Sequence, residues 1–413
     1  NSRIWKNKDI NNDFNNQENV KKLFVAEEII STELNPELSI NITKFNKNNK
    51  ITNSRNDYGS QNYNGLLNKE RSYTFSKLDD INQLDFRPAF LSDGLIFFDK
   101  KGAITRYDDK SKIIWKKNYY SKAEKKLKPK LFFSVIKDTL IVVDNIGKYY
   151  SISLNTGKLN WSKNNTYPFN SEIKKFENKF FAIDYKNILR CFKIDDGSEC
   201  WKMKTEDSFT ISGSKFSLII LNDLVIFNNS IGDVTAVDIK TGLINWQLPT
   251  QSSSIINKTY RFKNSQLVSD GNSIFFSNNK NEFYSVDVKT GVVNWINDLN
   301  SNITPIITGN LIFSVSNNGY LYVIEKNKGN ILRITDLFNN YKTKKRKDIQ
   351  PVGFVIGNTN LYLTNSDGKI IIADLSDGKV LNIEKVSGDI VSEPFIFNNN
   401  LYVVRNGSIV QYN

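Results

Sequence analysis

The chain of 413 residues is long enough for two or three ordinary domains or for one large repeat architecture, and its formal net charge is +13. It contains no histidine, which excludes Ser-His-Asp and Cys-His catalysis, histidine haem ligation and nearly all zinc sites. No apolar run approaches the ~18 residues of a membrane-spanning helix. The excess of lysine is spread along the chain, so background composition explains it better than a selected basic surface.

The first 71 residues differ from the rest of the chain. Asn1–Gln17 and Lys44–Lys69 are rich in Asn, Lys and Ser, so we expect residues 1–71 to be extended or poorly ordered. Between them, Val20–Ile30 is compatible with a short amphipathic helix or with a strand lying on the rest of the protein. No signal-peptide core is visible at the start, which leaves open whether a leader or a lipid anchor precedes residue 1.

From residue 72 onward the chain is a series of repeats, each with a strand, a tight turn and a second strand. Aligned on the turn, the copies are Gly102–Trp115, Gly147–Trp161, Asn187–Trp201, Gly232–Trp246, Asn281–Trp295, Gly319–Arg333, Gly368–Asn382 and Gly407–Asn413. Tryptophan ends the first five copies, at spacings of 46, 40, 45 and 49 residues. This period is typical of one four-stranded blade of a β-propeller.

Each repeat is preceded by two more strand-like runs, so a blade contains strands A, B, C and D in chain order. In one copy, Lys215–Leu221 and Leu224–Phe227 are strands A and B, joined by a short Asn-Asp turn. Glycine in the C–D turn supplies the positive φ that a tight hairpin needs. We expect the tryptophans that end strand D to fill the gaps between blades: Trp115, Trp161, Trp201, Trp246 and Trp295.

The last copy ends after strand C, which would leave the ring open. We therefore expect Ser72–Lys77 to supply the missing strand D and to close the ring. The predicted fold is all-β, an eight-bladed β-propeller of four-stranded antiparallel blades over residues 72–413. A seven-bladed ring is the alternative, if Arg87–Trp115 packs differently.

Alternating strand direction places the D–A and B–C connections on one face of the ring. The C–D turns are short and uniform, whereas four D–A connections are long and irregular: Asn118–Lys130, Thr205–Ser214, Leu248–Asn264 and Asn339–Gln350. Binding residues tend to lie on such loops, so we expect the functional surface on this face. The first and last of these loops are strongly basic, which indicates either solvated loops or attraction to an anionic membrane surface or an acidic partner. Without an aromatic stacking platform, nucleic acid is not an expected partner.

Two cysteines, Cys191 and Cys200, lie on strands C and D of one blade. The hairpin makes a disulfide between them feasible, and two free thiols are an equally good interpretation. They do not form a CxxC redox or metal motif.

The repeated V-D-x-x-T-G-x-x-x-W, present at Val237–Trp246 and Val286–Trp295, resembles the PQQ-like propeller family. That family includes quinoprotein dehydrogenases and BamB, the lipoprotein of the outer-membrane β-barrel assembly machinery. The dehydrogenase branch implies a longer chain, adjacent cysteines stacked on the quinone and a calcium site. The BamB branch is similar in size, blade count and ring closure, and it implies no cofactor, no metal and no catalysis.

The BamB resemblance implies a site on two neighbouring D–A loops that contact a BamA-like barrel protein. A Leu-x-Leu-Arg-Gly motif of the first loop matches Phe209, Ile211, Ser212 and Gly213, with Ser212 where arginine is expected. The second loop is acidic in the family, whereas Arg261 and Lys263 occupy it here.

The function implied is therefore that of a non-enzymatic scaffold in the periplasm, at the outer membrane of a Gram-negative bacterium. It would act as a monomer within a complex, binding a BamA-like protein and unfolded barrel substrates. The alternatives are a PQQ-dependent dehydrogenase and an extracytoplasmic propeller that binds a small ligand or a glycan.

Overall fold

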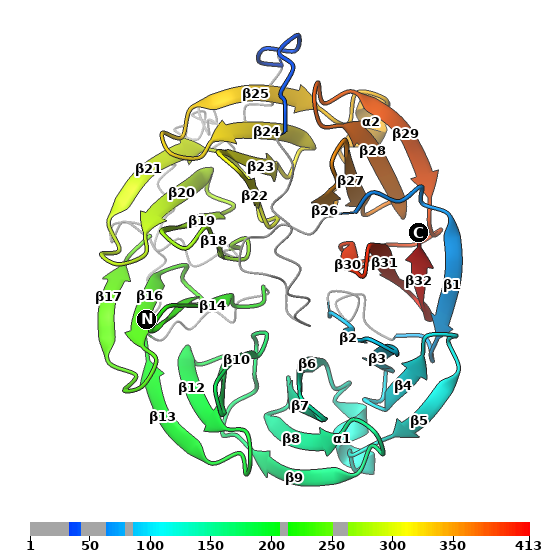
Figure 1. Cartoon of the computed structure of the whole chain (residues 1–413), viewed down its shortest axis with the longest axis vertical. Helices are drawn as coiled ribbons and strands as arrows, with labels where there is room; N and C mark the ends of the chain where they lie inside the picture. The colour runs from blue at the N-terminus through cyan, green and yellow to red at the C-terminus, as the bar shows by residue number, and fades with distance from the viewer. Residues whose placement is uncertain (1–32, 43–62, 79–85, 207–213, 251–262) are drawn as a thin grey trace, which may run out of the picture.

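The chain forms a ring of eight four-stranded antiparallel sheets, which confirms the predicted eight-bladed β-propeller (Figure 1). The computed structural model describes residues 33–42, 63–78, 86–206, 214–250 and 263–413. Arg87–Trp115 contributes most of a complete blade, so the alternative of seven blades is wrong. Among the described residues, no helix is both long enough and apolar enough to span a bilayer.

Within each blade the strands follow one another from the ring centre to the rim (Figure 1). Blades 1 to 4 consist of β2 (Ala89–Leu91), β3 (Gly94–Phe98), β4 (Ile104–Asp108) and β5 (Ile113–Lys117); β6 (Leu131–Ile136), β7 (Thr139–Asp144), β8 (Lys148–Ser153) and β9 (Leu159–Asn164); β10 (Lys174–Phe176), β11 (Lys179–Ile183), β12 (Ile188–Lys193) and β13 (Glu199–Lys204); and β14 (Leu218–Leu221), β15 (Leu224–Asn228), β16 (Val234–Asp238) and β17 (Ile244–Leu248).

Blades 5 to 8 repeat this order. They consist of β18 (Val268–Ser269), β19 (Ser273–Ser277), β20 (Glu282–Asp287) and β21 (Val293–Asp298); β22 (Ile306–Thr308), β23 (Leu311–Val315), β24 (Tyr320–Glu325) and β25 (Ile331–Asp336); β26 (Pro351–Ile356), β27 (Asn360–Asn365), β28 (Lys369–Asp374) and β29 (Val380–Lys385); and β30 (Phe395–Phe397), β31 (Asn400–Arg405), β32 (Ser408–Tyr412) and β1 (Lys69–Thr74).

The ring closes where the N-terminal strand β1 pairs antiparallel with the last strand β32, as predicted. The paired strand begins at Lys69, three residues before the expected start at Ser72, and it ends at Thr74. Only one of its side chains, that of Tyr73, is buried, because β1 is an outer strand with one face in solvent. Its other residues are polar, so the hydrophobic pattern gave little guidance to the ends of this strand.

The hydrophobic core lies between blades. Ile226 and Trp246 of blade 4, for example, belong to one buried cluster with Ile274 and Val286 of blade 5. The middle strands of a blade are buried on both faces, while the outermost strand alternates between exposed and covered positions, as in β21. This is the arrangement expected when flat sheets pack face to face around an axis.

The repeated D-x-x-T-G of the sequence builds the C–D turn. In blade 4, the Asp238 carboxylate accepts hydrogen bonds from the backbone N–H groups of Lys240 and Thr241 and from the Thr241 hydroxyl. Gly242 follows with a φ of +72°, which a residue with a side chain rarely adopts. A β-bulge between Ala236 and Val237 then brings the motif tryptophan to the gap between blades.

Each motif tryptophan donates its indole N–H to a backbone carbonyl of the following blade. The pairs are Trp115 with Leu154, Trp161 with Ile194, Trp201 with Ile239, Trp246 with Val288 and Trp295 with Lys326. Arg333 stands at the same position in blade 6, and its guanidinium donates to Leu375 of blade 7 in the same way.

Residues 33–42 lie against blades 6 and 7. Leu34 forms an antiparallel bridge with Ile334 at the outer edge of β25. Arg333 also donates to the carbonyl of Leu38, and the Ile40 N–H donates to the carbonyl of Ser376 in blade 7. This part of the N-terminal segment is therefore fixed to the rim by backbone hydrogen bonds.

Candidate functional site

The D–A and B–C connections share one face of the ring, and hydrogen bonds between them join neighbouring blades there. Asn187, in the B–C turn of blade 3, donates to the carbonyl of Glu206 at 2.7 Å and to the hydroxyl of Ser230 at 2.9 Å. The Ser230 N–H returns a hydrogen bond to the Asn187 side chain. Thr205, where the first predicted partner loop begins, donates to the carbonyl of Asn187. The stem of Thr205–Ser214 is thus fixed to blades 3 and 4.

The stem of the second predicted loop, Leu248–Asn264, is fixed in a similar way. The Thr250 N–H donates to the carboxylate of Asp233 at 3.0 Å, and Lys263 exchanges hydrogen bonds with Asn279 of blade 5. Burial raises the pKa of Asp233, and the nearby negative charge of Glu206 raises it further. Both loop stems therefore rise from adjacent blades, with two acidic side chains between them.

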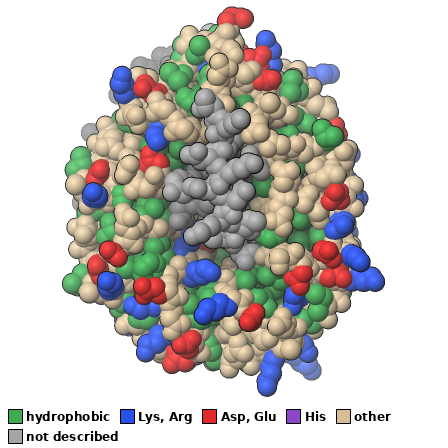
Figure 2. All heavy atoms as spheres, in the orientation of Figure 1, with side chains coloured by type: hydrophobic (Ala, Val, Ile, Leu, Met, Phe, Trp, Pro, Cys, Tyr) green, Lys and Arg blue, Asp and Glu red, His purple; other side chains and the backbone are tan. Residues whose placement is uncertain are grey.

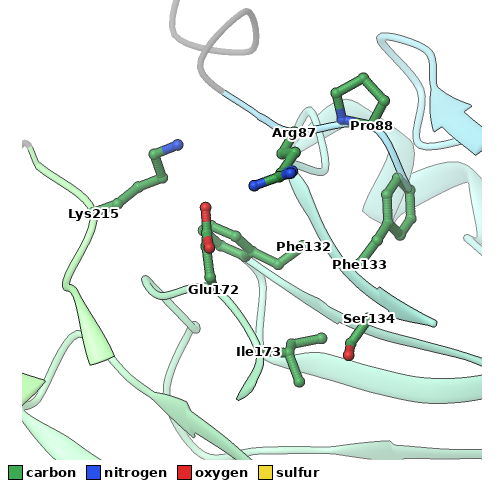
Figure 3. Close-up of a pocket in the computed structure, with 8 residues that line it drawn as sticks. All are labelled: Arg87, Pro88, Phe132, Phe133, Ser134, Glu172, Ile173 and Lys215. Carbon is green, nitrogen blue, oxygen red and sulfur yellow. The ribbon is translucent and has the colours of Figure 1, made fainter. Parts of the chain in front are cut away.

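A pocket lies where the innermost strands of blades 1 to 4 begin (Figure 3). It is lined by Arg87, Pro88, Phe132, Phe133, Ser134, Glu172, Ile173 and Lys215. Figure 3 shows the side chains of Arg87 and Lys215 directed toward Glu172, beside the ring of Phe132. The Lys215 ammonium also lies 5.4 Å from the ring centre of Phe86, within the range of a cation–π contact.

Two cations and one carboxylate give this pocket a net positive charge, and its walls are aromatic. These side chains suit the binding of an anionic or aromatic group. Lys215 directly follows the first predicted partner loop, which ends at Ser214.

The basic loop between blades 1 and 2 carries the short helix α1 (Lys122–Lys126). Ser121 and Glu124 form a capping box at its start, and Glu124 also pairs with Lys148 of blade 2 at 3.2 Å. Below the helix, the Tyr120 hydroxyl donates to Asp144 at 2.6 Å. These contacts hold the loop on blade 2.

The second basic loop carries α2 (Thr343–Arg346), and its cations are partly neutralised. Arg346 pairs with Asp336, and the Lys345 ammonium lies 3.9 Å from a carboxylate oxygen of Asp367. On the face turned to the viewer in Figure 2, basic and acidic side chains alternate around the rim. The basic character of the sequence therefore does not produce a single-sign surface there.

Of the residues assigned to the partner site, Phe209, Ile211, Ser212, Gly213 and Arg261 lie outside the described residues. Lys263 is exposed, at the end of the second loop. Sequence reasoning missed the pocket, because its residues come from four blades and share no motif. The hydrogen-bonded turn at Asn187 was also missed, although its place as the first residue of a repeat was a usable signal.

Cys191 and Cys200 are free thiols in the structure. In the described ranges, no group of three or more Cys, Asp or Glu side chains is arranged to hold a metal ion. Both cysteines lie on the outer strands β12 and β13, so neither faces the ring centre.

A sequence model of the family described as outer membrane protein assembly factor BamB matches residues 100–335, more than half of the chain. No curated protein matches it. Among solved structures, the fold resembles BamB from Moraxella catarrhalis, with a TM-score of 0.68 and 16% identity over 84% of this chain and 100% of that one.

The fold also resembles two dehydrogenases. A europium-containing methanol dehydrogenase has a TM-score of 0.65 and 10% identity, over 86% of this chain and 88% of that one. A quinohemoprotein alcohol dehydrogenase from Comamonas testosteroni has a TM-score of 0.62 and 9% identity, over 86% of this chain and 78% of that one. At these identities the resemblance concerns the fold alone.

Proposed function

This chain belongs to the family of the outer membrane protein assembly factor BamB, and on that premise we propose that it is a non-enzymatic scaffold for the assembly of outer-membrane β-barrel proteins. It acts in the periplasm, at the outer membrane of a Gram-negative bacterium, and binds a BamA-like barrel protein. The observation that carries the proposal is the family match together with two long loops whose stems are fixed side by side on blades 3 to 5.

The stems support binding because hydrogen bonds fix them to blades 3 to 5. Backbone and turn groups of Asn187, Thr205 and Asp233 make the stem hydrogen bonds. We propose that residues between the stems, including Phe209 and Ile211, contact the partner. The pocket of Arg87 and Lys215 extends this proposed surface.

An outer strand of this propeller also accepts an extended segment, which supports binding of unfolded barrel strands. Leu34 exchanges two backbone hydrogen bonds with Ile334 at the edge of β25. The equivalent residue of blade 5 is Ile296, which follows Trp295 as Ile334 follows Arg333 and is 53% exposed. We propose that β21 receives a substrate strand at this position by the same backbone pairing.

The helix α1 supplies a second contact, with anionic lipid headgroups. Lys122, Lys126 and Lys128 are exposed around it, and Leu127 is 60% exposed between them. A basic surface with one exposed apolar side chain suits a membrane interface. Co-sedimentation with anionic vesicles, weakened by Lys126→Glu and by added salt, tests this part of the proposal.

The partner site is tested by co-purification of the full chain with the BamA-like protein. Phe209→Asp and Ile211→Asp are expected to abolish it. The matched control is Leu243→Asp, which makes the same kind of change at a 70% exposed residue in a C–D turn, on the opposite face. Retained binding in both loop variants, or equal loss in the control, removes this site assignment.

The dehydrogenase alternative has its own test. Quinone absorbance or calcium-dependent dye reduction by the purified protein would favour it over the scaffold. The two cysteines stand nine positions apart on outer strands, unlike the adjacent pair implied by the dehydrogenase resemblance.

A further inference from the structure

The outer hairpin of blade 3 brings two cysteines to adjoining positions. Cys191 of β12 pairs directly with Trp201 of β13. The register then shifts, so that Phe192 pairs with Glu199 and Cys200 is the extra residue of a β-bulge. In such a bulge the two residues opposite a single partner direct their side chains to roughly the same face as that partner. The thiols of Cys191 and Cys200 are therefore expected to meet.

Other blades show directly that side chains at these two positions touch. In blade 2 the bulge residue Asn160 donates to the hydroxyl of Ser151 at 3.0 Å. Ser151 is the residue that pairs with the motif tryptophan of this blade. In blade 5 the equivalent Asn294 donates to Ser285 at 3.2 Å. In both blades the side chain of the bulge residue is directed to that of the residue opposite the tryptophan, and Cys200 and Cys191 occupy these same two positions in blade 3.

The surroundings of the thiols are consistent with this contact. Both belong to one apolar cluster, in which Cys191 is fully buried and Cys200 is partly exposed. Burial raises the pKa of the Cys191 thiol, and a hydrogen bond with the Cys200 thiol raises it further. Of the two, Cys200 is the thiol that an external reagent reaches first.

We propose that Cys191 and Cys200 form an intrachain disulfide that joins strands C and D of blade 3. The oxidant is an external disulfide, either a small molecule or a protein. The Cys200 thiolate attacks it, forming a mixed disulfide and releasing one thiol. Cys191 then loses its proton and attacks the Cys200 sulfur, which releases the second thiol. Two protons and two electrons leave the pair, and the external disulfide is reduced to two thiols.

The disulfide acts on the hairpin that carries the first partner loop. The strand β13 ends at Lys204, and Thr205 begins the stem described above. Joining β13 to β12 prevents the outer strand from separating, so the oxidised protein keeps the loop stem in place. An oxidising compartment such as the periplasm favours this form. The pairing itself does not depend on the proposed function.

The test is peptide mapping of the purified full chain after exposure to oxidised glutathione. Free thiols are blocked by alkylation and the protein is digested with trypsin, which separates residues 191–193 from residues 194–202. We expect these two peptides to be joined, with the loss of two hydrogen atoms in mass. Reduction should separate them and release two alkylatable thiols.

Single variants test the order of reaction. In Cys191→Ser, Cys200 is expected to retain glutathione as a stable mixed disulfide, because no second thiol displaces it. In Cys200→Ser, Cys191 is expected to resist glutathione in the folded protein and to react in denaturant. Equal reactivity of both variants in the folded protein would overturn the assigned roles.

A matched control comes from blade 2, where Ser151→Cys with Asn160→Cys recreates the pair in a Cys191→Ser, Cys200→Ser background. Cross-linking of this engineered pair without cross-linking of the native pair would overturn the proposal for blade 3. If neither the engineered pair nor the native pair forms a cross-link, both the geometric argument and the proposal are overturned.

Discussion

The indole nitrogen of Trp246 in blade 4 donates to the backbone carbonyl of Val288 in blade 5 at 2.9 Å. The same ring covers Gly291 in the turn that follows, where a Cβ atom would lie 2.6 Å from the indole Cδ2. The tryptophan and the glycine of the repeat motif therefore act on each other across two blades. Each repeat is completed by the next one, which explains why the two residues recur together.

Gly291→Ala is expected to be strongly destabilising, because the new methyl group collides with Trp246 and the φ of +73° disfavours a side chain. We expect a loss of about 3 kcal/mol in the free energy of unfolding, measured with urea. The control is Gly271→Ala in the same blade, where φ is +96° but a Cβ atom would have no neighbour within 4 Å. It should cost only about 1 kcal/mol, from backbone strain alone. Equal losses would show that the contact with Trp246 is unimportant.

Trp246→Ala is expected to cost about 3–5 kcal/mol, because it removes a large buried ring and leaves the Val288 carbonyl without its donor. Removing the ring also removes the collision at residue 291. In a double-mutant cycle, Gly291→Ala should therefore cost less in the Trp246→Ala background, falling to about the value of Gly271→Ala. Additive losses from the two substitutions would contradict a direct contact.

The fold could be predicted because its determinants are local and repeated. The Asp-x-x-Thr-Gly turn at Asp238–Gly242 is encoded in five consecutive residues, and the eightfold recurrence gives the blade count. The role of Arg333 could not be predicted in this way, because it replaces the motif tryptophan and its partner Leu38 lies outside the repeats.

The candidate site was predictable only in outline. Strand direction predicted that the long D–A loops share one face with the B–C turns, and Asn187 and Asp233 of those turns fix the loop stems there. The contacts expected for Phe209 and Ile211 stay predictions, since these residues lie outside the described ranges. The pocket between Arg87 and Lys215 depends on how four blades converge, which no local pattern encodes.

Arg333→Met is expected to release the N-terminal segment from the rim. The side chain keeps much of its apolar volume but loses the donors to Leu38 and Leu375. Hydrogen exchange at the amides of Leu34 and Ile40, which are bonded to Ile334 and Ser376, should then become faster.

The control for this variant is Trp295→Met, which removes the equivalent donor one blade earlier, where it bonds to Lys326. It should lower overall stability without selectively accelerating exchange in residues 33–42. The same pattern of exchange in both variants would contradict a special role for Arg333.

Asp144 gives a prediction for the dependence of stability on pH. Burial raises the pKa of this carboxyl group to about 6, despite hydrogen bonds from Tyr120 and from the N–H groups of Ile146 and Lys148. Between about pH 4 and pH 6 the folded state thus binds the proton more tightly than the unfolded state. This tighter proton binding stabilises the folded state; the stabilisation is complete below pH 4 and is lost as the pH rises through 6.

Asp144→Asn should remove this dependence, because an amide does not titrate and Asn229 already makes the same turn contacts in blade 4. Relative to the unsubstituted protein, the variant should gain about 3 kcal/mol in the free energy of unfolding between pH 4 and pH 7. Urea titrations across this range measure the change. Asp238→Asn is the control of opposite sign: hydrogen bonds from Thr241 lower the pKa of Asp238, so that variant should lose relative stability as the pH rises. If the difference in the free energy of unfolding between Asp144→Asn and the unsubstituted protein stays constant with pH, then Asp144 is not the titrating group.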